Sequence, residues 1–305
     1  MSLPAEFALI ARHFRPLAGQ GGLDLSDDAA LLTPPPGREL VLAADAMIAG
    51  VHFLADDPPE TIGRKLLRVN LSDLAAMGAD PLAYLMTVAL PRDTADAWLA
   101  AFVEGLALDQ AEFGLAVLGG DTVSTSGPVS LSLTILGTVA PGQALRRGGA
   151  RPGDELWVSG TIGDGALGLR AARGEIASEY LAGRYRLPQP RLALGRALRG
   201  IATACMDISD GLVQDLGHLC RASGCGAVIE AARVPLSDAA RGYPLAPLLT
   251  GGDDYELLFA ARPGTVPGGM AVTRIGHFTQ GAVDVQVFDE AGQPMALPSQ
   301  GWSHF

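Results

Sequence analysis

The fold of this chain is constrained most by an alternation of strand-like and helix-like segments that occurs twice along the sequence. In the first half, short apolar runs alternate with two stretches of helical periodicity. Such alternation is typical of sheets covered by helices in α/β or α+β domains. The strand-like runs are 39–45, 83–90 and 129–137, and the helical patterns are 61–77 and 94–113.

A stretch with neither periodicity, "APGQALRRGGARPGDEL" (140–156), separates the two series and is rich in Gly, Pro and Arg. We therefore expect an N-terminal domain over 1–140 and a C-terminal domain over 141–305. The length of 305 residues agrees with two domains of roughly 150 residues each. The second series has strand-like runs and helical patterns at 155–160, 163–174, 191–199, 203–209, 211–222, 227–232, 255–261 and 283–289.

Two short acidic patterns recur in the same order in both halves. "NLSD" (70–73) precedes "GGD" (119–121) by 49 residues, and "DISD" (207–210) precedes "GGD" (251–253) by 44 residues. Words this short also coincide by chance, so the recurrence alone does not establish a duplication. It does suggest an acidic site made of two parts.

Asp73 is the one charged residue in "VNLSDLAAMGA". If 61–77 form one helix, about 100° per residue places Asp73 on the apolar stripe beside Leu66 and Val69. A carboxylate on a buried face is unfavourable unless a cation or several donors satisfy it. The alternative is that Ser72 caps a helix starting there, and that Asp73 only favours its first turn.

Further aspartates end apolar runs or flank turns, where side chains from several strands can converge on a crevice. They are Asp27, Asp28, Asp45, Asp121, Asp207 and Asp210. Mg²⁺ sites use a few such carboxylates together with substrate phosphates and water. For Asp207 and Asp210, an ordinary N-cap of a helix beginning near Gly211 is the competing interpretation.

Several phosphate-binding and catalytic motifs are absent. There is no GxxxxGK[ST], and Lys65 is the only lysine, so neither a P-loop nor a protein-kinase lysine is available. The one compact basic cluster, Arg146, Arg147 and Arg151, is either a solvated linker or a phosphate clamp. The five histidines show no HxxxH or HExxH spacing, and no GxSxG occurs. These features favour metal-assisted phosphoryl transfer over zinc or serine hydrolysis.

Charge and hydropathy exclude other classes of function. The net charge of −11 argues against direct binding of a nucleic-acid backbone, and the longest apolar stretches are about half of what a bilayer crossing needs. The N-terminus lacks the positive charge of a signal peptide and shows a helical pattern with Leu3, Phe7, Ile10 and Phe14 on one face, so we expect a cytoplasmic protein. Cys205, Cys220 and Cys225, without CxxC spacing, are expected to be reduced core residues.

Five motifs in order, "DDAALL", "VNLSDLAAMGADP", "GGDT", "DISDGL" and "GGDDYEL", resemble those of the thiamine-monophosphate kinases. This family belongs to the superfamily of aminoimidazole ribonucleotide synthetase and selenophosphate synthetase. The resemblance extends from the N-terminal helix to the closing "GWSHF". It implies a two-domain α/β (α+β) architecture with mixed sheets covered by helices, a homodimer formed through the N-terminal sheets, and phosphorylation of thiamine monophosphate by ATP to thiamine diphosphate.

The resemblance also implies roles for residues that match its motifs. Six carboxylates would bind Mg²⁺: Asp28, Asp45, Asp73, Asp121, Asp207 and Asp210. Contacts to ATP would come from Gly120, Asp121, Arg147 and Ser209, and contacts to thiamine monophosphate from His52, Asp253 and Trp302. No catalytic base is expected, because the acceptor phosphate is already ionised at neutral pH.

Three positions depart from the family pattern. "LDLSDD" replaces a Gly-rich turn before the first acids, Ala43 and Ala44 replace hydroxyl residues, and Asp253 replaces the more usual Glu. Two other functions compete. Another ATP-using synthetase of the superfamily would need a reactive Cys and Lys near the N-terminal loop, and neither occurs before residue 65. A non-catalytic nucleotide-binding scaffold would not need the six motif aspartates.

Overall fold

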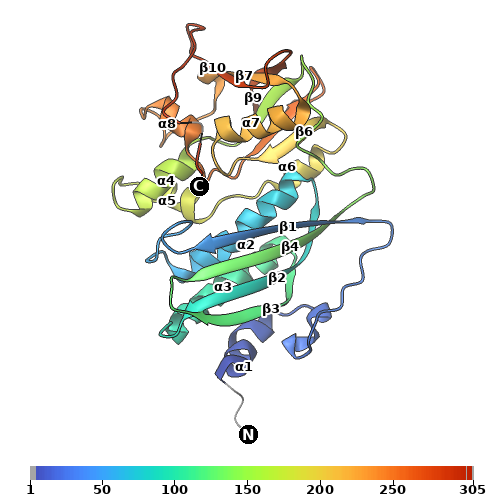
Figure 1. Ribbon diagram of the computed structural model, residues 1–305, viewed down its shortest axis with the longest axis vertical. Helices are drawn as coiled ribbons and strands as arrows, with labels where there is room; N and C mark the ends of the chain where they lie inside the picture. Colours follow the sequence, from blue (N-terminus) through green and yellow to red (C-terminus); the bar gives the residue numbers. More distant parts are fainter. Residues whose placement is uncertain (1–4, 300, 304–305) are drawn as a thin grey trace. The chain divides into compact units, whose positions relative to one another are not determined.

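The computed structural model describes residues 5–299 and 301–303, and the chain divides into two compact units (Figure 1). Unit 1 comprises Met1–Leu74 and Asp80–Pro141, and unit 2 comprises Ala75–Ala79 and Gly142–Phe305. Each unit contains one mixed β-sheet with helices. The predicted α/β (α+β) class, with mixed sheets covered by helices, is confirmed.

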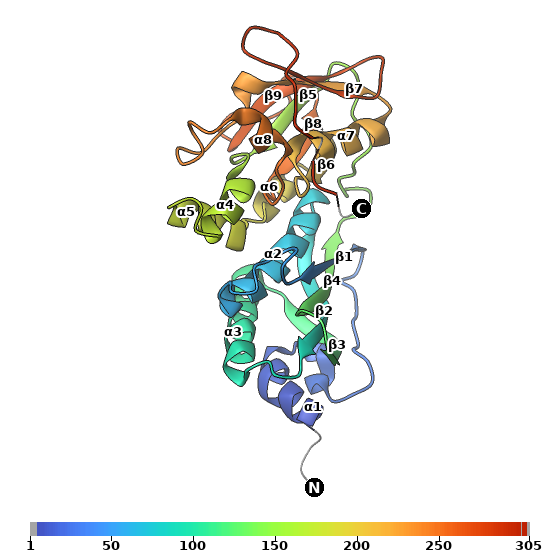
Figure 2. The ribbon, with the colours of Figure 1, turned by 60° about the vertical axis from the view of Figure 1, so that its left-hand side comes forward.

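Unit 1 is built on a four-stranded sheet in the order β1-β4-β2-β3. Its strands are β1 (Glu39–Ile48), β4 (Ser130–Val139), β2 (Asp80–Pro91) and β3 (Ala116–Thr125). β4 is antiparallel to both neighbours, whereas β2 and β3 are parallel and are connected by a helix, as parallel neighbours require. Helices α2 (Pro59–Ala76) and α3 (Asp96–Phe113) lie on one side of this sheet (Figure 2).

The two faces of the unit 1 sheet differ in burial. Along β4, Leu131, Leu133 and Ile135 are buried and alternate with half-exposed residues, as expected for a strand with one face in the core. The other face carries apolar side chains that are largely exposed in the single chain, including Leu42 (61%), Leu85 (41%) and Val123 (45%). We call these residues the open sheet face.

Helix α2 is buried almost all round. It begins with Pro59, a residue suited to the first helical turn, and ends before Gly78, whose φ of +64° favours glycine. Leu66, Leu71 and Leu74 are fully buried. A Cβ on Gly105 of α3 would lie 2.0 Å from the carbonyl oxygen of Glu60, so this glycine allows the two helices to pack closely.

Unit 2 is built on a six-stranded sheet in the order β10-β7-β9-β5-β8-β6. Its strands are β5 (Glu155–Ser159), β6 (Ala202–Asp207), β7 (Gly226–Glu230), β8 (Leu257–Ala261), β9 (Val272–Thr279) and β10 (Val285–Phe288). Only the β10/β7 pair is parallel among the described pairs. The helices are α4 (Asp164–Ala172), α5 (Glu179–Arg186), α6 (Leu192–Ala197), α7 (Leu212–Ser223) and α8 (Leu245–Thr250).

The structure bears on three further expectations, which concern the cysteines, the N-terminal helix and membrane-spanning segments. Cys205, Cys220 and Cys225 are free and buried, as predicted. The N-terminal segment forms α1 (Ala5–Leu9) and a π-helical turn (Ile10–Phe14); Phe14 is buried, but Phe7 is 56% exposed, so these two residues do not share one buried face. Leu3 lies outside the described residues. None of the helices described is both long and apolar enough to cross a membrane.

Candidate active site

In unit 2, the turn between β6 and α7 carries three of the predicted site residues. Asp207 is the last residue of β6 and is 5% exposed, and Ser209 and Asp210 follow in the turn. Gly211, with φ of +121°, is the N-cap residue of α7, and a Cβ there would lie 2.9 Å from the backbone of Thr250. The turn therefore requires glycine at this position.

Asp215, which the sequence analysis missed, holds this turn in place. Its Oδ2 accepts hydrogen bonds from the N–H groups of Ser209 (3.0 Å), Asp210 (3.0 Å) and Gly211 (3.1 Å). The N-cap interpretation of Asp207 and Asp210 is wrong, because Gly211 is the N-cap residue of α7 and no side chain makes the capping bond. The sequence did contain a signal for Asp215, because it is an acid on the same helical face as Leu212 and Leu219.

The acids around this turn concentrate negative charge. Burial, and next the charge of Asp207, raise the pKa of Asp215 to about 7, although the N–H donors of Asp210 and Ser209 lower it. The charge of Asp210 also raises it. Oxygen donors held this close repel one another, and a divalent cation relieves such repulsion. Carboxylate oxygens suit a hard cation such as Mg²⁺, so the chemistry of these side chains fits Mg²⁺ even though the described acids do not form a closed group of three or more ligands.

The "GGDDYEL" segment lies directly against the turn. Asp253 N–H donates to the carbonyl oxygen of Ser209 (2.9 Å), and Tyr255 N–H donates to that of Ile208 (2.8 Å). A Cβ on Gly252 would lie 2.3 Å from the Ser209 carbonyl oxygen, so no side chain fits there. Two motifs that are over forty residues apart in sequence are therefore adjacent in unit 2.

The end of the chain reaches the same place. Trp302 N–H donates to the carbonyl oxygen of Asp210 (2.9 Å), and Gln214 Nε2 donates to the Trp302 carbonyl oxygen (2.6 Å). The Trp302 side chain is 53% exposed. Ser209, Asp210, Asp253 and Trp302, predicted from three separate motifs, thus lie together.

Arg147 is exposed and close to α7. Burial lowers the pKa of His218 on that helix, and so do the charges of Arg221 and Arg147. The charge of Asp210 raises it. The Arg147 carbonyl oxygen accepts a bond from Ser223 Oγ at 3.4 Å. The Arg147 backbone thus lies at the C-terminal end of α7, and the exposed side chain can meet an anion from solvent.

In unit 1, a cavity of about 510 Å³ brings together Asp28, Gly120 and Asp121. Gly120 is needed by the sheet, because a Cβ there would lie 1.7 Å from the carbonyl oxygen of Met86 on β2. Asp28 and Asp121 are exposed. A cavity lined by three carboxylates, those of Asp27, Asp28 and Asp121, and by a glycine backbone has the chemistry to receive a metal-bound phosphate.

Asp45 lies at the other edge of the same sheet. It pairs with Leu133 on β4, which pairs with Met86 on β2, which in turn pairs with Gly120 on β3. Three strand spacings of about 4.8 Å separate the edge strands by roughly 14 Å. Within one chain, Asp45 and Asp121 are therefore too far apart to bind the same ion.

Asp73 is half-buried in the last turn of α2. Ser72 is fully buried inside this helix, which begins thirteen residues earlier, at Pro59, so the capping alternative for Ser72 and Asp73 is wrong. Asp45 is paired with the buried Leu133 and so points to the sheet face that α2 covers. Among the residues that the structure describes, no group of three or more His, Cys, Asp or Glu side chains is arranged to hold a metal ion.

His52 follows β1 in a turn that its own ring stabilises. Ile48 N–H donates to His52 Nδ1 (3.0 Å), and Lys65 Nζ donates to the His52 carbonyl oxygen (3.0 Å). Lys65 is 2% exposed. The single lysine of the chain thus anchors the His52 turn from within α2, a role that no sequence pattern indicated.

Comparison with known proteins agrees with this two-unit arrangement. Residues 26–139 match the family model "AIR synthase related protein, N-terminal domain", and residues 151–283 match the corresponding C-terminal domain. A thiamine-monophosphate kinase of Caulobacter vibrioides is 44% identical, covering 99% of this chain and 91% of the relative. One from Escherichia coli K12 is 41% identical, covering 98% of both chains. The solved structure of AaThiL complexed with AMPPCP and TMP is 31% identical, with a TM-score of 0.81, and covers 100% of this chain and 99% of that chain.

Proposed function

The chain belongs to the thiamine-monophosphate kinases, within the AIR synthase related family, and from this premise we propose how it phosphorylates thiamine monophosphate with ATP. The γ-phosphoryl group passes directly and in line to the phosphate of thiamine monophosphate, giving thiamine diphosphate and ADP. The observation that carries the proposal is the convergence of Ser209, Asp210, Asp253 and Trp302 in unit 2.

The proposed magnesium ligands are Asp28, Asp45, Asp73, Asp121, Asp207 and Asp210. When bound, Mg²⁺ neutralises charge on two anionic substrates that otherwise repel each other. The carboxylates of each unit would hold metal ions within that unit, and Asp215 fixes the turn that carries Asp210. No side chain is assigned as a general base, since the acceptor phosphate oxygen is ionised at neutral pH.

The chain's own residues bind and orient the two substrates. We assign ATP contacts to Gly120 and Asp121 at the unit 1 cavity, and to Arg147 and Ser209 in unit 2. We assign contacts with thiamine monophosphate to His52, Asp253 and Trp302. The exposed indole of Trp302 suits a thiazolium ring, because a cation is attracted to the face of an aromatic ring.

The two domains divide these tasks in our proposal. Residues 1–140 bind ATP and Mg²⁺ and form a homodimer, and residues 141–305 supply the remaining site residues. The exposed apolar residues of the open sheet face support a dimer formed through unit 1. We also propose a cytoplasmic location, because the reaction consumes ATP, and no direct contact with nucleic acid, because the net charge is −11.

A product assay tests this function. Purified protein with Mg²⁺, ATP and thiamine monophosphate should form thiamine diphosphate and ADP in equal amounts, and EDTA should stop the reaction until Mg²⁺ is restored in excess. Release of inorganic phosphate without the diphosphate product would favour another ATP-using synthetase of the superfamily. Nucleotide binding without any turnover would favour a scaffold.

A further inference from the structure

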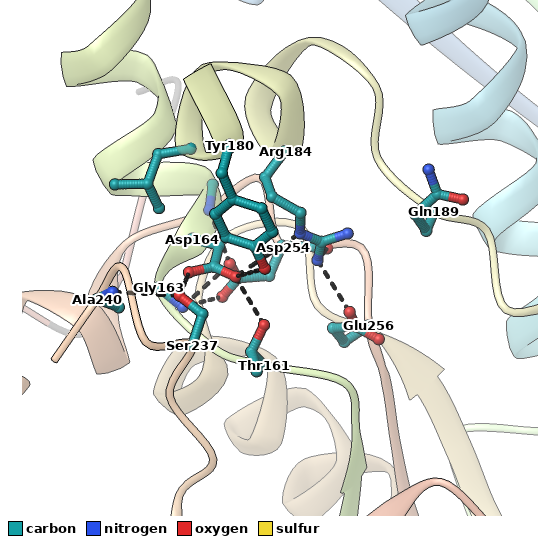
Figure 3. A network of polar contacts seen from close by, with 12 residues as sticks. Thr161, Gly163, Asp164, Tyr180, Arg184, Gln189, Ser237, Ala240, Asp254 and Glu256 are labelled. Atoms are coloured by element: carbon teal, nitrogen blue, oxygen red, sulfur yellow. Dashed lines mark hydrogen bonds and ion pairs between the residues drawn. The ribbon is translucent and has the colours of Figure 1, made fainter. Parts of the chain in front are cut away.

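A buried polar network in unit 2 connects the "GGDDYEL" segment to the start of α4 (Figure 3). Its acidic members are Asp164, Asp254 and Glu256, which are 0%, 1% and 0% exposed. None of the three belongs to the proposed set of substrate or metal contacts. Buried carboxylates are unfavourable unless they are bonded, so each must have partners that justify its burial.

Asp254 receives backbone N–H groups from the first turn of α4. Gly163 N–H lies 3.0 Å and 2.8 Å from its two carboxylate oxygens, and Gly165 N–H lies 3.0 Å from Oδ1. These are N–H groups that a helix cannot satisfy internally, and the helix end also favours negative charge. The carboxylate therefore ties the middle of the segment to a rigid element.

The residues on both sides of Asp254 have unusual backbone conformations. Asp253 has a φ of 68° and Tyr255 a φ of 51°, in the left-handed region that residues other than glycine rarely adopt. Such conformations persist only where surrounding contacts enforce them. Asp254 lies between these two residues, and its hydrogen bonds to Gly163 and Gly165 can hold both of them in the left-handed conformation.

Close packing restricts the same segment. A Cβ on Gly165 would lie 2.4 Å from both the carbonyl carbon and oxygen of Asp253. On the far side of the segment, Glu256 accepts from Ser159 Oγ (2.6 Å), Arg184 (2.9 Å) and Arg191 Nε (2.6 Å). The segment is thus fixed at both ends, and the Asp253 side chain leaves it in a set direction.

We infer that Asp254 is a positioning residue for thiamine monophosphate, because it holds Asp253 in the left-handed conformation from which Asp253 meets the substrate. The inference rests on the proposed function, in which Asp253 contacts thiamine monophosphate. Loss of the Asp254 contacts lets the Asp253 backbone relax toward common conformations. Binding of thiamine monophosphate then weakens. Binding of ATP changes little, because the turn that carries Ser209 is also held by three hydrogen bonds to Asp215.

Asp164 provides a matched control. It is equally buried and begins α4, and Figure 3 shows it beside Asp254. Its carboxylate accepts from hydroxyl groups, namely Thr161 Oγ1 (2.6 Å), Tyr180 Oη (3.0 Å) and Ser237 Oγ (2.6 Å). The same Asp→Asn substitution there disturbs the network without removing a bond that Asp254 makes.

The test compares Asp254→Asn with Asp164→Asn in the full chain, by thermal unfolding and by steady-state kinetics with Mg²⁺, ATP and thiamine monophosphate. We expect Asp254→Asn to raise KM for thiamine monophosphate by about tenfold, as for loss of one buried hydrogen bond, and KM for ATP by less than about twofold. Asp164→Asn should lower the unfolding temperature but leave KM for thiamine monophosphate within about twofold of wild type.

Two outcomes overturn the inference: an unchanged KM for thiamine monophosphate in Asp254→Asn, or equal increases in both variants. If Asp254→Asn does not fold, Gly165→Ala replaces it as the test. The added methyl group displaces the Asp253 backbone and leaves the Asp254 carboxylate intact. A normal KM for thiamine monophosphate in Gly165→Ala also overturns the inference. An inactive wild type contradicts the proposed function instead, so the two failures are distinguishable.

Discussion

Asp73 lies at a position where an aspartate is unfavourable for the stability of its helix. It lies in the last turn of a helix whose neighbouring side chains are almost all buried, and it is itself half-buried. Helix formation does not require an aspartate there, because Asp has a lower helix propensity than most residues and its charge is unfavourable near a helix C-terminus. The position is therefore better explained by a ligand than by the stability of α2.

The first prediction follows from that cost. Asp73→Asn keeps the shape of the side chain but removes its charge, so it should lower kcat by roughly 100-fold or more while the unfolding temperature stays within a few degrees of wild type. Asp93→Asn, at an exposed turn, is the control and should be fully active. An unfolded or fully active Asp73→Asn protein would make Asp73 structural or incidental.

The residues that we propose as ligand contacts can be predicted from the sequence more completely than the residues that hold them in place. Ser209, Asp210, Asp253 and Trp302 lie in motifs, and the structure brings them together. Asp215, by contrast, acts through backbone N–H groups of a turn, and neither composition nor periodicity shows that partner. The supporting roles of Lys65 and Asp254 were not predicted either, because a hydrogen bond between distant segments exists only once the chain has folded.

At the scale of elements, long periodic segments and most short apolar strands were predicted well, and three short elements without a clear pattern were not. The helix expected over 61–77 spans Pro59–Ala76, and the helix expected over 94–113 spans Asp96–Phe113. α5, α8 and β9 were missed. α5 is short and mostly polar, α8 has six residues with a proline inside, and β9 contains Arg274, Gly276 and His277. Tertiary contacts, rather than local pattern, stabilise such elements.

The second prediction concerns the contact between α2 and α3. Arg68, 2% exposed, is paired with the fully buried Asp109, with Nε 2.6 Å from Oδ2. Asp109→Asn leaves a buried guanidinium group without its full partner and should lower the free energy of unfolding by about 3 kcal/mol. Glu112→Gln removes a partner that is 48% exposed and should cost less than about 1 kcal/mol. Urea denaturation measures both, and equal losses would contradict the burial argument.

At the scale of the whole molecule, the chain contains two sheets, and each unit holds one of the recurring acidic patterns. The sequence predicted the fold class because the alternation of elements is long and regular. It did not predict that Asp45 and Asp121 lie on opposite edges of the unit 1 sheet, since strand order is decided by tertiary pairing. One chain therefore cannot bring these two carboxylates to a single ion.

The open sheet face leads to the last prediction, on assembly. Leu42, Leu85 and Val123 expose apolar surface on strands of unit 1, and symmetric pairing of two copies would bury the same patch on both. In sedimentation, the wild type should have twice the 31.5 kDa mass of the chain. Leu42→Glu should sediment as a monomer, because a charge opposite another apolar sheet is costly to bury. Leu108→Glu changes an equally apolar exposed residue, but on α3, and should stay dimeric. A monomeric wild type, or a dimeric Leu42→Glu variant, would show that this face does not form the interface.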